Sequence, residues 1–380
     1  MRVMGSGPLS GVRIVEIAGL GPVPFAAMLM ADLGADVIRV DRPGEHRPSG
    51  ADLLARGRRS AIVDLKQPAG AEVVLRLVEG ADALVEGFRP GVAERLGIGP
   101  QACLELNPRL VYGRMTGWGQ DGPLAATAGH DINYLALTGA LHAIGPAERP
   151  AIPLNLIGDF GGGALYLAVG VLAGLLEARQ SGRGQVIDAA MVDGTTHLTT
   201  LIVGLLTSGE WRDTRASNLL DGGAPFYDVY ETADGKHVSV GALEPQFYAE
   251  VIYRLGLTDA PDREDPRQWA ELRTRLAAAF ATKTRDEWAE VFAGSDACVA
   301  PVLSLSEAAD HPHISARDVL VEHQGVRQPA PAPRFSRTPG ALSYPPARPG
   351  EHTREVLRDW GLTDVDALLH AGVVIQSHPS

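Results

Sequence analysis

The sequence predicts an α/β fold, with a larger Rossmann-like domain on an open, mostly parallel sheet and a smaller α+β domain. Two observations carry this prediction. Short apolar runs alternate with helical patterns through the first half of the chain, and from Pro225 onward the pattern changes to paired strands followed by helices. Alternating strands and helices are typical of parallel sheets, because a crossover segment must join each strand to the next. A length of 380 residues favours two domains.

The first βαβ unit occupies residues 12–40. It consists of the apolar run Val12–Ala18, the Gly/Pro turn Gly19–Pro24, the helical pattern Phe25–Leu33 and the apolar run Ala35–Val40. The same alternation continues along the chain. It predicts a strand at Ala61–Leu65, a helix at Ala69–Val78, and strands at Ala83–Glu86 and Leu110–Arg114. Residues 1–200, together with residues 330–380, are therefore expected to form the large domain.

The second half predicts the smaller domain, at residues 225–325. Phe226–Glu231 and His237–Val240 alternate like paired strands, and the residues between them form a hairpin turn signal. Helices are expected at Trp269–Phe280 and Arg285–Phe292. Residues 201–224 and 326–350 are expected to connect the domains, because the stretch Gln328–Arg348 is rich in proline. A terminal helix, Glu351–Trp360, is expected to return to the large domain.

Composition excludes several classes of protein. The formal net charge of −12 argues against a nucleic-acid binder, which usually presents a basic face. The longest apolar stretch, Val186–Leu206, contains Asp188, Asp193 and His197, so it predicts a buried helix rather than a membrane span. Residues Met1–Ser10 show no basic region followed by an apolar run, so no secretion signal is expected there. We expect no membrane association.

The two cysteines, Cys103 and Cys298, are far apart and form no Cys-x-x-Cys pair. A disulfide framework and a zinc site are therefore not expected. Two free thiols fit a reducing, cytoplasmic location. The close histidine pair His311 and His313 is interpreted as part of a loop, and no metal site is predicted.

The turn after the first strand, Gly19-Leu20-Gly21-Pro22-Val23-Pro24, partly matches the dinucleotide-binding fingerprint. That fingerprint needs a third glycine and free backbone N–H groups near the pyrophosphate. Here Pro24 replaces the third glycine and Pro22 has no N–H. A nicotinamide-dependent dehydrogenase therefore remains only a remote alternative.

Basic residues gather early in this otherwise acidic chain. They are Arg39, Arg42, Arg47, Arg56, Arg58, Arg59 and Lys66. A solvated surface would explain such a cluster. Several of these residues lie at or just after expected strand ends, where open sheets bind ligands, and guanidinium groups suit phosphates. The cluster is equally consistent with a binding site for a ligand that carries several phosphates, such as CoA.

Two further residues are candidates for acid–base chemistry. His130 lies in the motif Gly129-His130-Asp131-Ile132-Asn133-Tyr134, and Asp159 precedes a helical pattern at Phe160–Ala178. An aspartate directly before a helix is commonly only its N-cap, which is the structural alternative to a catalytic role. Gly161, Gly162 and Gly163 disfavour a regular first turn. These residues without side chains indicate that another segment packs closely against the start of the helix. Histidine is also common as a structural, hydrogen-bonded residue.

The sequence resembles the CaiB/BaiF, or class III CoA-transferase, superfamily. The resemblance extends from Leu9–Val12 to Gly350–Thr353. It is carried by the segments Ala35–Gly44, Val63–Lys66, Phe88–Gly91, Gly129–Tyr134 and Gly222–Tyr227.

The resemblance implies an interlocked homodimer that acts on acyl-CoA thioesters without a separate cofactor. It implies that His130 and Asp159 are the catalytic pair and that Glu244, from the small domain, is an auxiliary acid. It also implies contacts to CoA and the thioester from two sets of residues. These are Arg42, Val63, Asp64, Leu65, Lys66 and Arg89, and the loop residues Gly129, Asp131, Ile132, Asn133 and Tyr134.

Two activities occur in this superfamily. Transferases use the aspartate that matches Asp159 as a nucleophile, and they carry a glycine-rich loop where this chain has Val240–Gln246. That glycine run is absent here, and the Gly129–Tyr134 motif of the racemases is intact. The resemblance therefore favours a racemase that interconverts (2R)- and (2S)-2-methylacyl-CoA, with a CoA-transferase as the alternative.

The residue types suit this chemistry. Inverting a carbon next to a thioester requires an acid–base group on each face of a planar enolate. An imidazole exchanges protons near neutral pH. The carboxyl group of Asp159 would need a raised pKa, and a helix N-terminus would oppose that. The backbone N–H of Asp159, or of the glycines after it, is the expected contact for the enolate oxygen.

Overall fold

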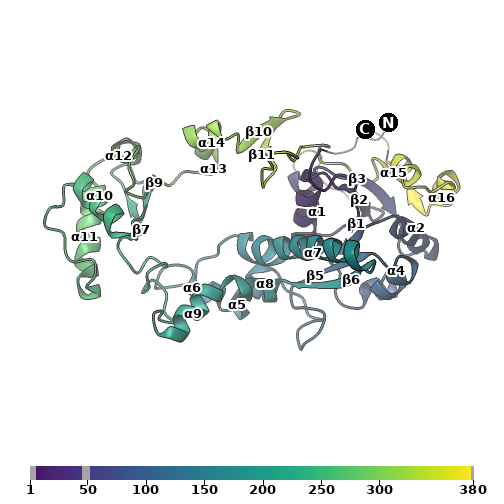
Figure 1. Ribbon diagram of the computed structural model, residues 1–380, viewed down its shortest axis with the longest axis horizontal. Coiled ribbons are helices and arrows are strands. Elements are labelled where there is room, and N and C mark those ends of the chain that lie inside the picture. Colours follow the sequence, from purple (N-terminus) through teal and green to yellow (C-terminus); the bar gives the residue numbers. More distant parts are fainter. Residues whose placement is uncertain (1–5, 45–51, 378–380) are drawn as a thin grey trace. The chain divides into compact units, whose positions relative to one another are not determined.

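The computed structural model describes residues 6–44 and 52–377, which form two compact units (Figure 1). The first unit contains the chain up to Thr138, Leu154–Leu198, and the chain from Asp318 onward. The second unit contains Gly139–Pro153 and Thr199–Arg317. The short segment Gly139–Pro153 therefore belongs to the second unit, although the sequence analysis included it in the large domain.

The first unit is built on a seven-stranded sheet. Its strands are β1 (Arg13–Ile17), β2 (Asp36–Asp41), β3 (Arg59–Val63), β4 (Ala83–Glu86), β5 (Val111–Thr116), β6 (Gln185–Ala190) and β12 (Val374–Ile375). The order is β12-β3-β2-β1-β4-β5-β6, and only β12 is antiparallel to its neighbour. The predicted open, mostly parallel sheet is confirmed. The direction in which successive strands are added to the sheet reverses between β1 and β4, and sheets of this kind bind ligands at that point.

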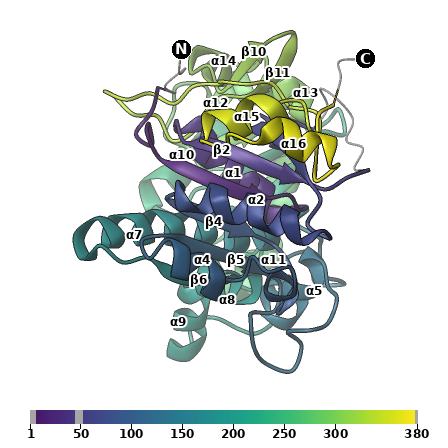
Figure 2. The ribbon, with the colours of Figure 1, turned by 90° about the vertical axis from the view of Figure 1, so that its right-hand side faces the viewer.

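Helices cover both faces of this sheet (Figure 2). Consecutive strand residues point to opposite faces, so Ile14 faces one core and Val15 faces the other. The first core includes α1 (Pro22–Asp32) and α7 (Leu165–Ser181). The second includes α2 (Pro68–Glu79), α4 (Pro100–Leu106), α15 (Thr353–Asp359) and α16 (Val365–His370). Burial on both faces explains the apolar residues on both sides of the strands, and charged strand residues such as Glu16 and Arg39 are buried in ion pairs.

Shorter elements complete the first unit. They are η1 (Leu53–Ala55), α3 (Val92–Arg95), α5 (Asp131–Leu137), the π-helix η2 (Leu156–Ala164), α8 (Met191–Leu198), and the hairpin β10 (Leu320–His323) and β11 (Val326–Pro329). The helical stretch Leu156–Ser181 has the length and apolar composition of a membrane span, which core helices also have. It contacts strands β5 and β6.

The prediction of one buried helix at Val186–Leu206 is wrong. This stretch contains strand β6, helix α8 and helix α9 (Thr200–Ser208). β6 lies at an edge of the sheet and pairs only with β5. Its first four residues are not buried, so it lacks the burial that makes central strands recognisable.

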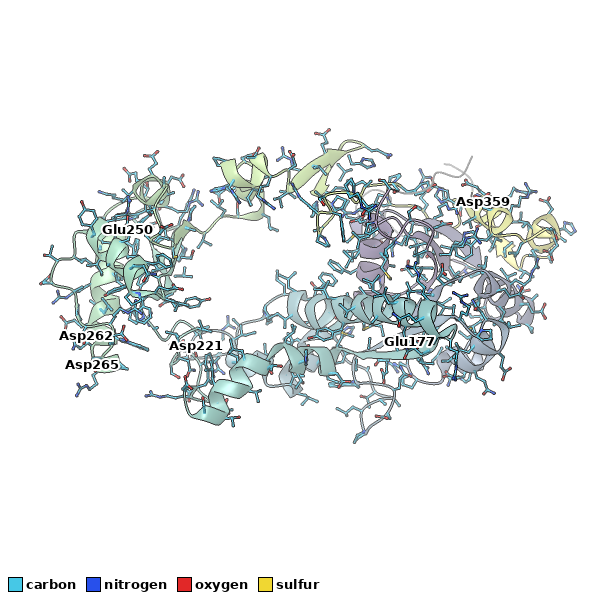
Figure 3. All side chains as sticks on the ribbon, in the orientation of Figure 1. Glu177, Asp221, Glu250, Asp262, Asp265 and Asp359 are labelled. Carbon is cyan, nitrogen blue, oxygen red and sulfur yellow. The ribbon has the colours of Figure 1, made fainter. Side chains whose placement is uncertain are left out.

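The second unit has its own core around a three-stranded antiparallel sheet. The strands are β7 (Tyr227–Glu231), β8 (His237–Gly241) and β9 (Val299–Pro301). Its helices are α6 (Ala140–Ala143), α9, α10 (Pro245–Leu255), η3 (Pro266–Gln268), α11 (Trp269–Phe280), α12 (Arg285–Phe292), α13 (Leu305–Ala308) and α14 (Pro312–Ala316). Acidic side chains are exposed on both units, as Glu177, Asp359 and Asp262 show (Figure 3).

Candidate active site

A cavity of about 490 Å³ opens at the carboxyl ends of β1, β4 and β5 in the first unit. Leu20–Val23 follow β1, Gly87–Pro90 follow β4, and Met115–Trp118 include the end of β5. The wall is completed by Ala125, Thr127, Ala128, Gly129, His130, Tyr134, Asp159 and Met191. The cavity therefore lies at the point where the strand order reverses.

His130 is presented to the cavity by the turn before α5. It is exposed, and its backbone N–H donates to Asn133 Oδ1 at 3.1 Å. The buried Tyr134 ring lies edge-on to Trp118, with ring centroids 4.7 Å apart. Its hydroxyl donates to the carbonyl oxygen of Gly129 at 2.5 Å. Both hydrogen bonds engage the Gly129–His130 peptide, so residues within the motif fix the backbone directly before His130.

Asp159 lies inside the π-helix η2, not at the N-cap of the helix that follows. The N-cap alternative is therefore wrong. The expectation of close packing at the glycines is confirmed, because a Cβ on Gly162 would lie 2.6 Å from the backbone nitrogen of Thr195 in α8. A π-helix is wider than an α-helix and is often found at functional sites. Here it carries the Asp159 carboxyl group into the cavity wall.

The pKa of Asp159 is raised above its ordinary value, and burial is the largest cause. The nearby Asp131 carboxylate raises it further, whereas His130 and the hydrogen bond from Asn155 Nδ2, at 3.3 Å, lower it. Asp159 lies in the first turn of η2, so the helix start expected to oppose this shift is beside it, and the pKa is nevertheless raised. A carboxyl group with a raised pKa is better matched to proton transfer near neutral pH.

Gly21 approaches the Asp159 carboxylate closely. A Cβ at Gly21 would lie 3.1 Å from Asp159 Oδ2, and its φ of +67° favours glycine. The first turn of α1 contains Pro22 and Pro24, which have no backbone N–H to offer a pyrophosphate. The partial fingerprint is thus explained by helix geometry and by space beside Asp159, which weakens the dehydrogenase alternative.

The expected oxyanion contact from Asp159 is also corrected. Its backbone N–H donates to Asp131 Oδ1 at 2.7 Å, so that N–H is already engaged. Asp131 is only 9% exposed.

Asp131, Ile132 and Asn133 are not among the residues that line the cavity, and their predicted contacts to CoA stay predictions.

The other predicted CoA contacts lie along the same edge of the sheet. Arg89 lines the cavity, Arg42 is exposed directly after β2, and Lys66 is exposed three residues after the end of β3. Val63 is the last residue of β3. Asp64 Oδ1 accepts the backbone N–H of Lys66 at 3.1 Å, and Leu65 between them is half-buried. Carboxyl ends of parallel strands share one edge, so these groups are placed to contact one extended ligand.

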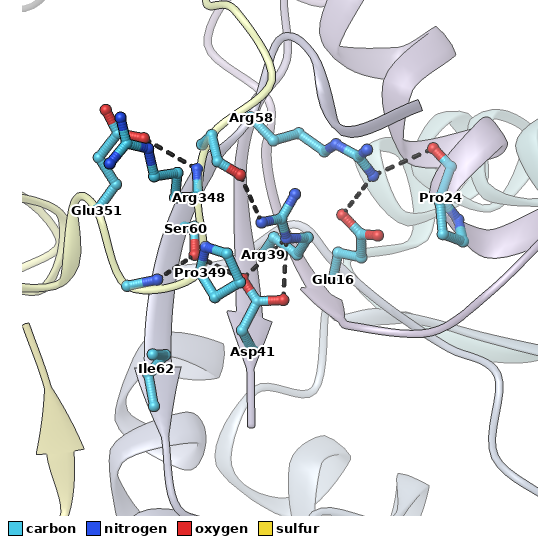
Figure 4. A network of polar contacts seen from close by, with 12 residues as sticks. Glu16, Pro24, Arg39, Asp41, Arg58, Ser60, Ile62, Arg348, Pro349 and Glu351 are labelled. Carbon is cyan, nitrogen blue, oxygen red and sulfur yellow. Dashed lines mark hydrogen bonds and ion pairs between the residues drawn. The ribbon is translucent and has the colours of Figure 1, made fainter. Parts of the chain in front are cut away.

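The interpretation of the basic cluster as a phosphate site is wrong for four of its members. Arg39 pairs with Asp41 at 2.9 Å, and Arg58 pairs with Glu16 at 2.7 Å, all with fully buried side chains (Figure 4). Arg56 pairs with Asp32 at 2.6 Å, and Arg59 with Asp359 at 2.7 Å. These arginines are therefore engaged by carboxylates within the first unit. Arg47 lies outside the described residues.

Glu244 belongs to the second unit and directly precedes α10. Sequence reasoning missed the residue that organises this turn. Arg263 donates to the carbonyl oxygens of Ala242 at 3.2 Å and of Leu243 at 2.5 Å. Its guanidinium also lies 4.2 Å from the ring centroid of Phe226. The role of Glu244 as an auxiliary acid stays a prediction.

The cavity wall includes apolar side chains that the sequence could not identify, namely Leu20, Met115, Trp118 and Met191. They come from three separate segments, and no local pattern links them. Within residues 6–44 and 52–377, no three His, Cys, Asp or Glu side chains are grouped so that they could hold a metal ion.

The fold and the cavity define a class: an α/β protein with acid–base side chains at the carboxyl edge of a parallel sheet. Comparison with known proteins specifies the family. The model of CoA-transferase family III matches residues 9–353, so the chain belongs to that family.

Curated relatives match almost the whole chain. An α-methylacyl-CoA racemase of Mus musculus is 46% identical over 97% of this chain and 98% of its own. The Homo sapiens protein of the same name is 45% identical with the same coverage. A solved structure of a CaiB/BaiF family protein from Brucella suis is similar in fold, with a TM-score of 0.81 at 23% identity, covering 93% of this chain and 100% of that one.

Proposed function

We propose that the protein is a racemase that interconverts the (2R)- and (2S)-forms of 2-methylacyl-CoA thioesters. The observation that carries this proposal is that His130 and Asp159, from separate segments, lie in the wall of one cavity. The 46% identity to an α-methylacyl-CoA racemase along nearly the whole chain supports it.

The proposed reaction moves only protons. One of the two groups removes the α-proton, and the electron pair of that C–H bond moves into the thioester to form an enolate. The other group then donates a proton to the opposite face of the same carbon, and the C–H bond forms again with inverted configuration. The raised pKa of Asp159 suits this exchange, because a general acid–base group works best when its pKa approaches the working pH.

No redox group or metal is needed for such a reaction, and CoA is part of the substrate. We propose that Arg42, Lys66 and Arg89 contact the phosphates of CoA, and that the turn at Val63–Lys66 contributes backbone groups. Their exposed cationic side chains on the edge of the sheet that holds the cavity support this assignment. The apolar side chains of Leu20 and Met191 in the cavity wall suit an acyl chain.

We also propose that the protein acts as an interlocked homodimer in the cytoplasm. In this arrangement the small domain of one chain helps to cover the active site of the other, and Glu244 acts as an auxiliary acid. The family resemblance supports the proposal. Light scattering coupled to size-exclusion chromatography tests the dimer, since the measured mass should be twice that of one chain.

The decisive test of activity is α-proton exchange. Each pure enantiomer of a 2-methylacyl-CoA should take up deuterium from heavy water at the α-carbon and lose optical rotation. Absence of both deuterium uptake and loss of rotation in the folded protein would refute the racemase proposal.

The CoA-transferase alternative is tested separately. Val240–Gln246 contains a single glycine, so it lacks the glycine run expected in a transferase. We therefore expect that mixing an acyl-CoA with acceptor carboxylates gives no new thioester at a rate comparable with α-exchange. Trapping Asp159 as a covalent acyl adduct with hydroxylamine or borohydride would restore the transferase mechanism.

A further inference from the structure

The side chain of Asp131 connects the two segments that carry His130 and Asp159. Asp131 is the first residue of α5 and follows His130 directly, and its Oδ1 accepts the backbone N–H of Asp159 at 2.7 Å. The two residues are 28 positions apart in sequence. This hydrogen bond therefore ties the start of α5 to the π-helical turn of η2.

The surroundings of Asp131 are built for this contact. The backbone amide of Gly158 also interacts with the Asp131 carboxylate, so two consecutive amides converge on one side chain. A Cβ on Gly158 would overlap Asp131 Oδ1, which means that only glycine leaves room for the approach. Hydrogen bonds from backbone amides compensate a buried carboxylate for much of the hydration it has lost.

An ordinary helix-end preference does not account for these observations. Acidic residues are favoured in the first turn of a helix, where the charge interacts with exposed amides of its own helix. Asp131 is instead 9% exposed, and its Oδ1 accepts from the amide of a different element. Its carboxylate also lies close enough to Asp159 to influence that side chain electrostatically.

We propose that Asp131 is a positioning residue that fixes the Gly158–Asp159 peptide and thereby the direction of the Asp159 carboxyl group in the cavity. The proposal rests on the proposed racemase function, in which Asp159 serves one face of the substrate. The amide nitrogen that Asp131 holds is bonded to the Cα that bears this carboxyl group. Displacing the peptide therefore displaces the carboxyl group, whereas His130 is presented by the turn on the other side of Asp131.

The test is α-proton exchange in heavy water, measured separately from each pure enantiomer of a 2-methylacyl-CoA. Asp159→Asn first identifies the enantiomer whose exchange depends on Asp159. Asp131→Ala should slow exchange of that same enantiomer on the order of 10²-fold, the loss that a misplaced group can cause. Exchange of the other enantiomer should change by less than about threefold, since His130 remains in place.

Asp131→Asn is the matched rescue variant, because its amide oxygen can accept the same hydrogen bond from Asp159. For that enantiomer, its exchange rate should be at least about tenfold higher than the rate of Asp131→Ala. If Asp131→Ala does not fold, Asp131→Glu replaces it. Its longer side chain must displace the peptide, and the same enantiomer-selective loss is expected.

Three results would overturn the proposal: unchanged exchange in Asp131→Ala, an equal loss for both enantiomers in the folded variant, or no recovery in Asp131→Asn. Failure of the proposed function gives a different result. In that case the unmodified protein would exchange neither enantiomer, and no variant would be needed to see it.

Discussion

At the scale of single residues, Gly21 controls the space beside Asp159. Gly21→Ala would place a methyl carbon 3.1 Å from Asp159 Oδ2, on a backbone with φ of +67°. The left-handed backbone costs about 1–3 kcal/mol for a residue other than glycine. We expect a folded but less stable protein in which α-proton exchange falls about tenfold or more, because the carboxyl group must move.

Gly19→Ala is the matched control, since a Cβ at Gly19 would meet no atom within 4 Å. It should leave exchange close to that of the unmodified protein. Wild-type exchange in Gly21→Ala would contradict the assignment of this space to Asp159.

His130 and Asp159 should fail in opposite ways when they are replaced. In His130→Gln, the enantiomer whose proton faces Asp159 should still exchange deuterium with retention, while the other should hardly exchange. Asp159→Asn should show the reverse selectivity. Inversion should fall by about 10²–10⁴-fold in both variants, the usual contribution of a general acid–base group. Deuterium uptake is measured against optical rotation. Equal residual exchange of both enantiomers in both variants would mean that one base serves both faces.

At the scale of elements, the contact between η2 and α8 determines where Asp159 lies. Gly162→Ala would place a Cβ 2.6 Å from the Thr195 backbone nitrogen, so the two elements must move apart. Overpacking of this kind costs about 1–3 kcal/mol of unfolding free energy. Gly204→Ala in α9 is the control, because its Cβ would meet nothing within 4 Å. It should stabilise the protein by about 0.5–1 kcal/mol. Urea unfolding measures both, and an undisturbed Gly162→Ala would contradict the close packing.

The end of β4 should make stability depend on pH. Glu86 is fully buried, and burial raises its pKa from 4.5 to about 7 against the opposing effects of Phe88 and Arg114. Its folded-state pKa exceeds its unfolded-state pKa, so its stabilising contribution is complete below pH 4.5 and is lost as the pH rises through 7. The slope is about 1.4 kcal/mol per pH unit within this window.

Glu86→Gln removes this titration. The unfolding free energy of the unmodified protein minus that of Glu86→Gln should therefore fall between pH 5 and pH 7, by on the order of 2–3 kcal/mol. Other titrating groups largely cancel in this difference. A difference that is constant across the window, or that rises with pH, would show that Glu86 is not protonated in the folded state near neutral pH.

Helices with strong local signals were predictable, and elements defined by distant contacts were not. The expected helices Trp269–Phe280 and Arg285–Phe292 match α11 and α12, because an apolar face repeats along each. The π-helix η2 was missed because its glycines are explained by packing against α8, which lies later in the chain. β12 was also missed, since a two-residue strand is defined only by its pairing with β3.

At the scale of the whole molecule, the contrast between local signals and distant contacts also applies to the site residues and to the arginine cluster. His130 and Asp159 were expected together, and they line one cavity. Arginines that are close in sequence were expected at a ligand, but Arg58 and Arg59 pair with Glu16 and Asp36 on other strands. Sequence proximity does not show which acid lies opposite a basic residue after folding. The motif resemblance paired His130 with Asp159, which sequence proximity and composition could not do.

The ligand preference of the folded chain distinguishes a CoA thioester site from a dinucleotide site. A ligand that binds only the folded state stabilises it, by about 2.7 kcal/mol at a concentration of 100 times its Kd. Acyl-CoA should therefore raise the Tm by several degrees, whereas NADH should leave it unchanged. The reason is the loop after β1, where Pro22 and Pro24 offer no amides to a dinucleotide, while Arg89 lines the cavity.

Arg89→Ala should weaken the shift caused by acyl-CoA more than any shift caused by the free acid, if its guanidinium holds a phosphate. Arg179→Ala is the matched control. Arg179 is exposed in the last turn of the 17-residue helix α7 and is not among the residues that line the cavity. Its replacement should leave both shifts intact. Stabilisation by NADH without stabilisation by acyl-CoA would overturn the assignment of this cavity to a CoA thioester, because the apolar and cationic groups around it would then serve a different ligand.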